Sequence, residues 1–162
     1  MNLRVRSAII ILLVVMLDRV SKLYIRSSYA PWDVTVVIPR IFNIVHAENP
    51  GAAFSMLASA PPIVRAVLLV GVSMLVMTVV GVMLWRLPKT ASALTSTSLA
   101  LVFGGAFGNL WDRVFRGSVT DFLQVFLGSY EFPSFNVADS AITMGAALLI
   151  LDLLRTRNTT AP

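Results

Sequence analysis

Two aspartates, Asp121 and Asp139, are the residues whose types and positions best suit chemistry. Asp121 stands between Thr120 and Phe122, and Asp139 has no basic residue within one helical turn, so neither carboxyl group has an obvious local countercharge. If the fold brings them together in a low-dielectric setting, the two groups cannot both ionise and should share one proton. Such a pair supplies one base and one acid, as peptide-bond hydrolysis by an aspartic protease requires.

The sequence lacks the residues that metal binding, triad catalysis or nucleic-acid binding would need. The chain lacks cysteine and has one histidine, His46, which argues against a metal site or a Ser/His/Asp triad. We therefore expect no metal ion and no other cofactor. The formal net charge is +5, but the basic residues form no stripe with interleaved aromatic residues, so we expect no nucleic-acid partner.

The composition is that of an integral membrane protein. Of 162 residues, 57% are hydrophobic and only 13% charged, against roughly 25% charged in soluble domains, and the mean hydropathy is +0.81. Two charge-free runs reach the ~20 residues that span a bilayer core, and two further runs carry charges near an end. We predict a single, mainly α membrane domain over residues 1–162, with transmembrane helices at about 7–26, 64–85, 90–112 and 136–154.

The short basic flanks predict the topology. Basic residues precede the first helix, follow the last one and lie between the second and third, which places both termini on the cytoplasmic side. Residues 27–61, rich in Val, Ile and Phe with Pro and Gly as breakers, indicate an outer segment of short strands and turns at the membrane surface. Residues 113–135 favour an outer loop or short helix lying in the interface.

Polar residues of three expected helices converge at the outer end. An ionisable group within a span costs about 2.5–3.5 kcal/mol at mid-helix, so such groups normally face the bundle interior or a wet cavity. A small-residue face, formed by Gly104, Gly105 and Gly108, would let the third helix approach a neighbour closely. The converging residues are Asp18, Lys22, Asn109, Asp112, Asn136 and Asp139.

Simpler interpretations of these residues remain open at this point. The i, i+4 spacing of Asp18 and Lys22 is typical of an intrahelical ion pair. Asp112 with Arg113 is equally typical of an ion pair that anchors a helix at the interface, and Asn136 alone suggests an N-cap. A non-enzymatic membrane protein, such as a small transporter subunit or a lipid-binding scaffold, is the alternative function.

Five motifs in order resemble the lipoprotein signal peptidases, also called signal peptidase II. They are DRVSK at 18–22, NPGAAF at 49–54, GGAFGNLWDR at 104–113, VTDF at 119–122 and FNVADS at 135–140. The resemblance covers nearly the whole chain. It implies a bacterial inner-membrane aspartic protease with four transmembrane helices, cytoplasmic termini, and a small β-cradle, loop and active site on the periplasmic side.

The resemblance also implies roles for individual residues. It makes Asp121 and Asp139 the catalytic aspartates. Its implied substrate is a prolipoprotein signal peptide in the membrane lipid, cut just before a diacylglyceryl-modified cysteine, and we expect a monomer. The remaining matched positions are substrate-binding (Asn49, Gly51, Asn109, Arg113 and Asn136) or supporting (Asp18, Lys22 and Asp112).

Overall fold

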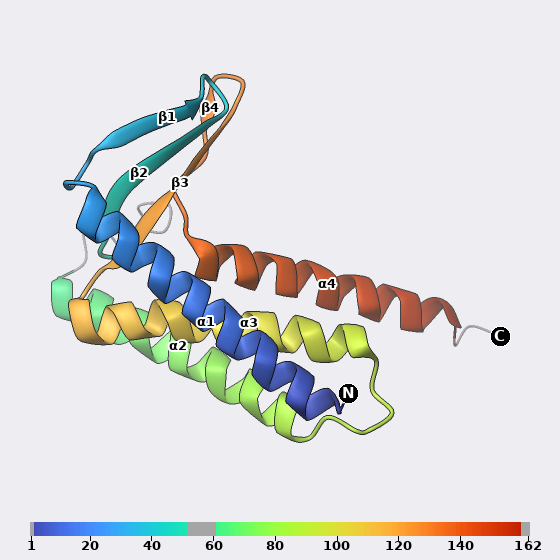
Figure 1. The fold of residues 1–162 in the computed structure, drawn as a ribbon. Helices are drawn as coiled ribbons and strands as arrows, with labels where there is room; N and C mark the ends of the chain where they lie inside the picture. Colours follow the sequence, from blue (N-terminus) through green and yellow to red (C-terminus); the bar gives the residue numbers. More distant parts are fainter. Residues whose placement is uncertain (1, 52–60, 160–162) are drawn as a thin grey trace.

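Four long helices and one small antiparallel sheet make up the described chain (Figure 1). A computed structural model describes residues 2–51 and 61–159. Residues 52–60 of the expected β-rich segment, which include positions 52–54 of the NPGAAF motif, lie outside the described residues. The elements are α1 (Leu3–Ser28), β1 (Val34–Ile38), β2 (Phe42–Asn49), α2 (Pro62–Trp85), α3 (Ala93–Arg116), β3 (Val119–Leu127), β4 (Tyr130–Glu131) and α4 (Val137–Thr159).

Helix α3 is the centre of the bundle, because α1, α2 and α4 all pack against it. The N-terminal end of α1 and the C-terminal end of α4 lie at the end of the bundle away from the sheet (Figure 1). Among the described residues, α2, α3 and α4 are long and apolar enough to cross a membrane. Helix α1 is as long as these, but Asp18, Arg19 and Lys22 interrupt its apolar stretch.

The sheet has the strand order β1-β2-β3-β4 and is antiparallel throughout. Strands β1 and β2 confirm the strands and turns predicted within residues 27–61. The loop or short helix expected over residues 113–135 is wrong in its central part, because α3 continues to Arg116 and β3 then pairs with β2. The partner strand, Phe42–Asn49, lies far earlier in the sequence, so no local pattern could indicate the pairing.

Glycines of α3 allow both neighbouring helices to approach closely, as predicted. A Cβ at Gly108 would lie 2.6 Å from Oδ2 of Asp18 on α1, and a Cβ at Gly105 would lie 2.4 Å from the carbonyl oxygen of Ala138 on α4. Only glycine fits at such distances. The small face therefore lets both α1 and α4 pack closely on α3, at the level of the converging polar residues.

A buried ion cluster joins the same three helices. The Lys22 ammonium has no exposed surface and lies 2.9 Å from Asp18, 2.9 Å from Asp112 and 3.0 Å from Oδ1 of Asn109. The ammonium donates hydrogen bonds to Asp18 and Asn109, and its contact with Asp112 is an ion pair. The other carboxylate oxygen of Asp18 accepts a hydrogen bond of 3.1 Å from the backbone nitrogen of Ala138, in the first turn of α4.

We predict that Gly105→Ala destabilises the protein by about 1–3 kcal/mol, because its methyl group would overlap the Ala138 carbonyl. Gly71→Ala on α2 is the matched control, since a Cβ there meets no atom within 4 Å. The control should leave the stability unchanged or raise it by up to about 1 kcal/mol. Unfolding by SDS in mixed micelles measures both, and equal effects would contradict the close approach.

We predict a larger loss for Lys22→Met, about 3–5 kcal/mol, because two buried carboxylates lose their shared cation. Lys89→Met removes an exposed lysine of the α2–α3 connection and should change the unfolding free energy little in neutral detergent. The same SDS titration compares the two variants. A Lys22→Met protein as stable as the control would mean that the cluster does not hold the helices together.

Candidate active site

Strand β3 and the start of α4 are fixed side by side by the backbone of Phe135. Its carbonyl oxygen accepts hydrogen bonds from the backbone nitrogens of Phe122 and Leu123, at 3.0 and 2.8 Å, and its own nitrogen donates to Leu123. This short bridge places Asn136, the next residue, beside Asp121 of β3. The two halves of the site thus meet through main-chain pairing of segments that lie on either side of β4.

Asn136 caps α4, and Asp139 completes the cap. The side-chain oxygen of Asn136 accepts from the backbone nitrogen of Asp139 at 3.0 Å, while Oδ2 of Asp139 accepts from the backbone nitrogen of Asn136 at 3.1 Å. This reciprocal pair is the hydrogen-bond pattern of a capping box. The predicted N-cap role of Asn136 is confirmed, and it fixes the position of the Asp139 carboxylate in the first turn.

Two asparagine amides connect the aspartates. Nδ2 of Asn136 donates to Oδ1 of Asp121 at 2.7 Å, and Nδ2 of Asn109 donates to Oδ1 of Asp139 at 2.7 Å. The amides also meet each other, because Nδ2 of Asn136 lies 3.3 Å from Oδ1 of Asn109. A continuous chain of hydrogen bonds therefore runs from Asp121 through both asparagines to Asp139.

Asn49 approaches Asp121 from the other side. It pairs with Val119 in the β2–β3 ladder, so its side chain lies diagonally from Asp121 on the same face of the sheet. Its Nδ2 donates to Oδ2 of Asp121 at 2.9 Å, and its Oδ1 accepts from the backbone nitrogen of Gly51 at 2.9 Å. Gly51 has a φ of 112°, which favours glycine, and its nitrogen orients the Asn49 amide.

The two carboxyl groups differ in exposure. Asp121 is 4% exposed, whereas Asp139 is half-buried. Burial raises the pKa of Asp121 to about 7; the hydrogen bond from Asn49 opposes this rise and the Asp139 carboxylate adds to it. A carboxyl group with this pKa retains a proton near neutral pH, next to a second carboxyl group that water can reach.

The residues predicted to bind substrate fall into two groups, asparagines that contact the aspartates and an arginine that is half-buried beside them. Asn109 and Asn136, 3% and 0% exposed, direct their amides to the aspartates rather than to an open surface, and Asn49 does the same for Asp121. Arg113 is half-buried within the electrostatic reach of Asp139 and Asp121, and its Nε has no hydrogen-bond partner among the described residues.

The supporting residues Asp18, Lys22 and Asp112 are fully buried behind the asparagines. The intrahelical pair of Asp18 and Lys22 is confirmed at 2.9 Å. The interfacial pairing suggested for Asp112 and Arg113 is not among the described ion pairs. Asp112 faces Lys22 and Arg19 instead, because it lies on the side of α3 that packs against α1.

Sequence reasoning missed a second set of polar contacts around the site. Arg26 reaches Asp112 at 3.6 Å and Thr120 at 3.0 Å, so it joins α1 to β3. Thr120 donates in turn to Glu48 of β2 at 2.9 Å. The signal available in the sequence was spacing, since Arg19, Lys22 and Arg26 lie at i, i+3 and i+7 on one helical face.

Comparison with known proteins identifies the family. The sequence pattern of the family described as signal peptidase (SPase) II matches residues 10–155. The chain is 39% identical over 145 residues to the lipoprotein signal peptidase of Syntrophus aciditrophicus, covering 88% of each chain. It is 43% identical over 148 residues to that of Pseudomonas fluorescens, covering 91% of this chain and 86% of the relative.

Solved structures agree with these relatives. A bacterial membrane enzyme solved by the in meso method at 2.3 Å resolution is similar with a TM-score of 0.84 and 29% identity, over 96% of this chain and 92% of that one. Another, solved at 1.9 Å, has a TM-score of 0.81 and 31% identity over 92% of each chain. Because both the sequence pattern and the relatives extend along almost the whole chain, the chain belongs to the signal peptidase II family.

Proposed function

We propose that Asp121 and Asp139 are the catalytic pair with which this chain removes signal peptides from prolipoproteins, cutting before a diacylglyceryl-modified cysteine. Signal peptidase II is a family of aspartic proteases that process prolipoproteins. The observation that supports the pair is the chain of hydrogen bonds from Asp121 through Asn136 and Asn109 to Asp139. It holds one carboxyl group buried and the other accessible, close to each other at the outer end of the bundle.

The proposed reaction uses the shared proton. The ionised member of the pair takes a proton from a water molecule, whose oxygen attacks the scissile carbonyl carbon. The protonated member donates a hydrogen bond to the carbonyl oxygen and polarises it. Collapse of the tetrahedral intermediate breaks the C–N bond, and a proton from the pair neutralises the leaving nitrogen. The proposal assigns the two roles to the pair and not to either aspartate by itself.

The asparagines act as positioning residues in this proposal. Asn49, Asn109 and Asn136 hold the carboxylates at defined orientations, a role that their burial supports better than direct contact with a peptide. Arg113, half-buried beside both aspartates, remains the proposed contact to the substrate backbone or lipid. Gly51 contributes by fixing Asn49.

We further propose a membrane topology, which the same arrangement supports. All four helices cross the bacterial inner membrane as one domain, with α1 included because its charged residues face α3 and α4 rather than lipid. Both termini are cytoplasmic, and the sheet with the aspartates is periplasmic. The chain acts as a monomer on a substrate that enters from the lipid.

The non-enzymatic alternative, a transporter subunit or lipid-binding scaffold, finds no support among the relatives, which are peptidases. A gradual change in transport or binding on Asp-to-Asn substitution would have been its expected result. The catalytic proposal expects an abrupt loss of cleavage instead.

We predict that Asp121→Asn and Asp139→Asn each reduce cleavage by about 10²- to 10⁴-fold, because each variant loses a member of the acid–base pair. The assay is release of the signal peptide from a diacylglyceryl-modified precursor by purified protein in detergent. An unmodified precursor, tested in parallel, should remain uncut. Asp152→Asn, at the opposite end of the bundle against Ser92, should cleave at the normal rate. Normal processing by either dyad variant would refute the assignment.

We predict that kcat/KM falls on the alkaline side with a midpoint near pH 7, the pKa to which burial raises Asp121. The sign follows from the raised pKa: the pair retains its shared proton below that pH and loses it above, so activity declines by about tenfold per pH unit beyond the midpoint. A pH series with folding checked by circular dichroism measures this. A rate that stays constant from pH 6 to pH 9 would contradict a shared proton at Asp121.

A further inference from the structure

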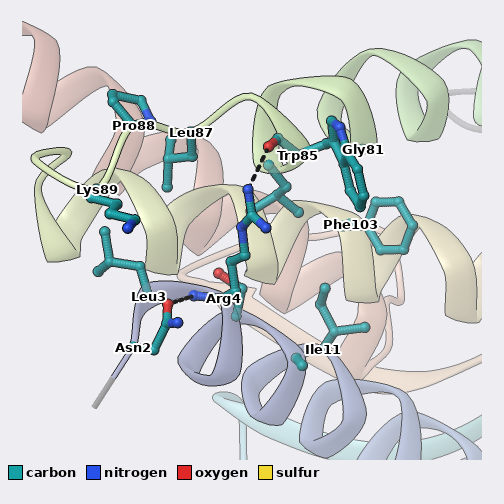
Figure 2. A pocket seen from close by; sticks show the side chains of 13 residues that line it. Asn2, Leu3, Arg4, Ile11, Gly81, Trp85, Leu87, Pro88, Lys89 and Phe103 are labelled. Atoms are coloured by element: carbon teal, nitrogen blue, oxygen red, sulfur yellow. Dashed lines mark hydrogen bonds between the residues drawn. The ribbon is translucent and has the colours of Figure 1, made fainter.

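A cavity of about 720 Å³ lies between the N-terminal part of α1 and the C-terminal end of α2 (Figure 2). This end of the bundle is the one away from the sheet (Figure 1). Ile11 of α1, Leu84 of α2 and Phe103 of α3 give it apolar walls. Gly81 lines it from α2. Its volume falls within the ~300–1,000 Å³ of small-molecule sites, and none of its residues belongs to the catalytic arrangement.

Two cationic side chains line this cavity. Arg4 of α1 and Lys89 of the α2–α3 connection both line it, and its lining contains no carboxylate among the described residues. The Arg4 guanidinium lies 5.5 Å from the centre of the Trp85 ring and donates one long hydrogen bond, 3.5 Å, to the Trp85 carbonyl (Figure 2). An arginine has five N–H donors, so most of them remain available to an anion.

The surroundings of the cavity are those of a membrane surface. Only 6% of the apolar window of α2 is buried in the protein, so this helix is largely exposed to its environment. Trp85 is 75% exposed at the end of α2, where a transmembrane helix commonly carries a tryptophan at headgroup depth. The apolar walls therefore lie at the depth of lipid tails and the two cations at the depth of lipid headgroups.

We propose that this cavity binds an anionic glycerophospholipid, with the phosphate between Arg4 and Lys89 and one acyl chain along Ile11 and Phe103. The charge complementarity and the apolar floor select this occupant: a zwitterionic lipid would bring an extra cation to two cations, and a free phosphate would leave the apolar walls empty. The site is remote from the aspartates, so the inference stands apart from the proposed peptidase reaction. In this proposal α1 and α2 hold a lipid at the end of the bundle opposite to the two aspartates.

The test is native mass spectrometry of the full chain in detergent with dioleoyl phosphatidylglycerol or dioleoyl phosphatidylcholine. Arg4→Gln with Lys89→Gln should weaken phosphatidylglycerol binding by about tenfold or more and leave phosphatidylcholine binding unchanged. The matched control is Arg6→Gln with Arg86→Gln, which removes two charges from the same end of the bundle but none from the cavity lining. It should stay within about twofold of the unmodified chain.

A second variant tests the apolar part. Ala8→Phe places a bulky ring at the cavity wall without changing charge, and should weaken phosphatidylglycerol binding. SDS titration confirms that each variant is folded. The proposal is overturned if Arg4→Gln with Lys89→Gln binds phosphatidylglycerol normally, if the Arg6 and Arg86 control loses binding equally, or if Ala8→Phe binds phosphatidylglycerol normally.

Discussion

The burial of the Lys22 ammonium is the constraint on which the rest of the structure depends. A charge without access to water is tolerated only when it is paired and hydrogen-bonded. Lys22 forms ion pairs with Asp18 and Asp112 and donates hydrogen bonds to Asp18 and Asn109, residues of α1 and α3. The cluster extends to α4 through the bond from Asp18 to the nitrogen of Ala138. The cluster therefore fixes the height of α1, α3 and α4 relative to one another and the side that each helix turns toward the others.

The same cluster determines how the candidate catalytic groups are held. Lys22 occupies Oδ1 of Asn109, so the amide nitrogen of Asn109 points the other way and donates to Asp139. Both polar atoms of the Asn136 side chain are also hydrogen-bonded. Its oxygen accepts from the backbone of the first turn of α4, and its nitrogen donates to Asp121. In a low-dielectric interior the hydrogen bonds of such a network are strong and hold its members in place. The rigidity keeps two acidic groups near each other although their charges repel.

Much of this arrangement could be anticipated from local pattern. Hydropathy indicated the spans of α2, α3 and α4, and the glycines of α3 indicated close packing. Strand β3 could not be anticipated, because its partner β2 lies far away in the sequence and pairing is decided by tertiary contacts. The buried position of Asn109 and Asn136 was equally hidden, since an asparagine that holds a carboxylate and one that contacts a substrate have the same local sequence.

The sequence by itself determined that this is an apolar helical chain with polar residues gathered at one end, and its ordered motifs indicated a signal peptidase II. Hydrophobic periodicity, composition and residue spacing are local properties of the sequence. They are enough to predict the helices and to indicate which residue types could do chemistry. Only the tertiary structure decided that Asp121 is buried against Asn49 and Asn136 while Asp139 stays accessible. That difference arises where a strand, two helix ends and a buried lysine meet, and burial there, rather than residue type, raises the pKa of Asp121.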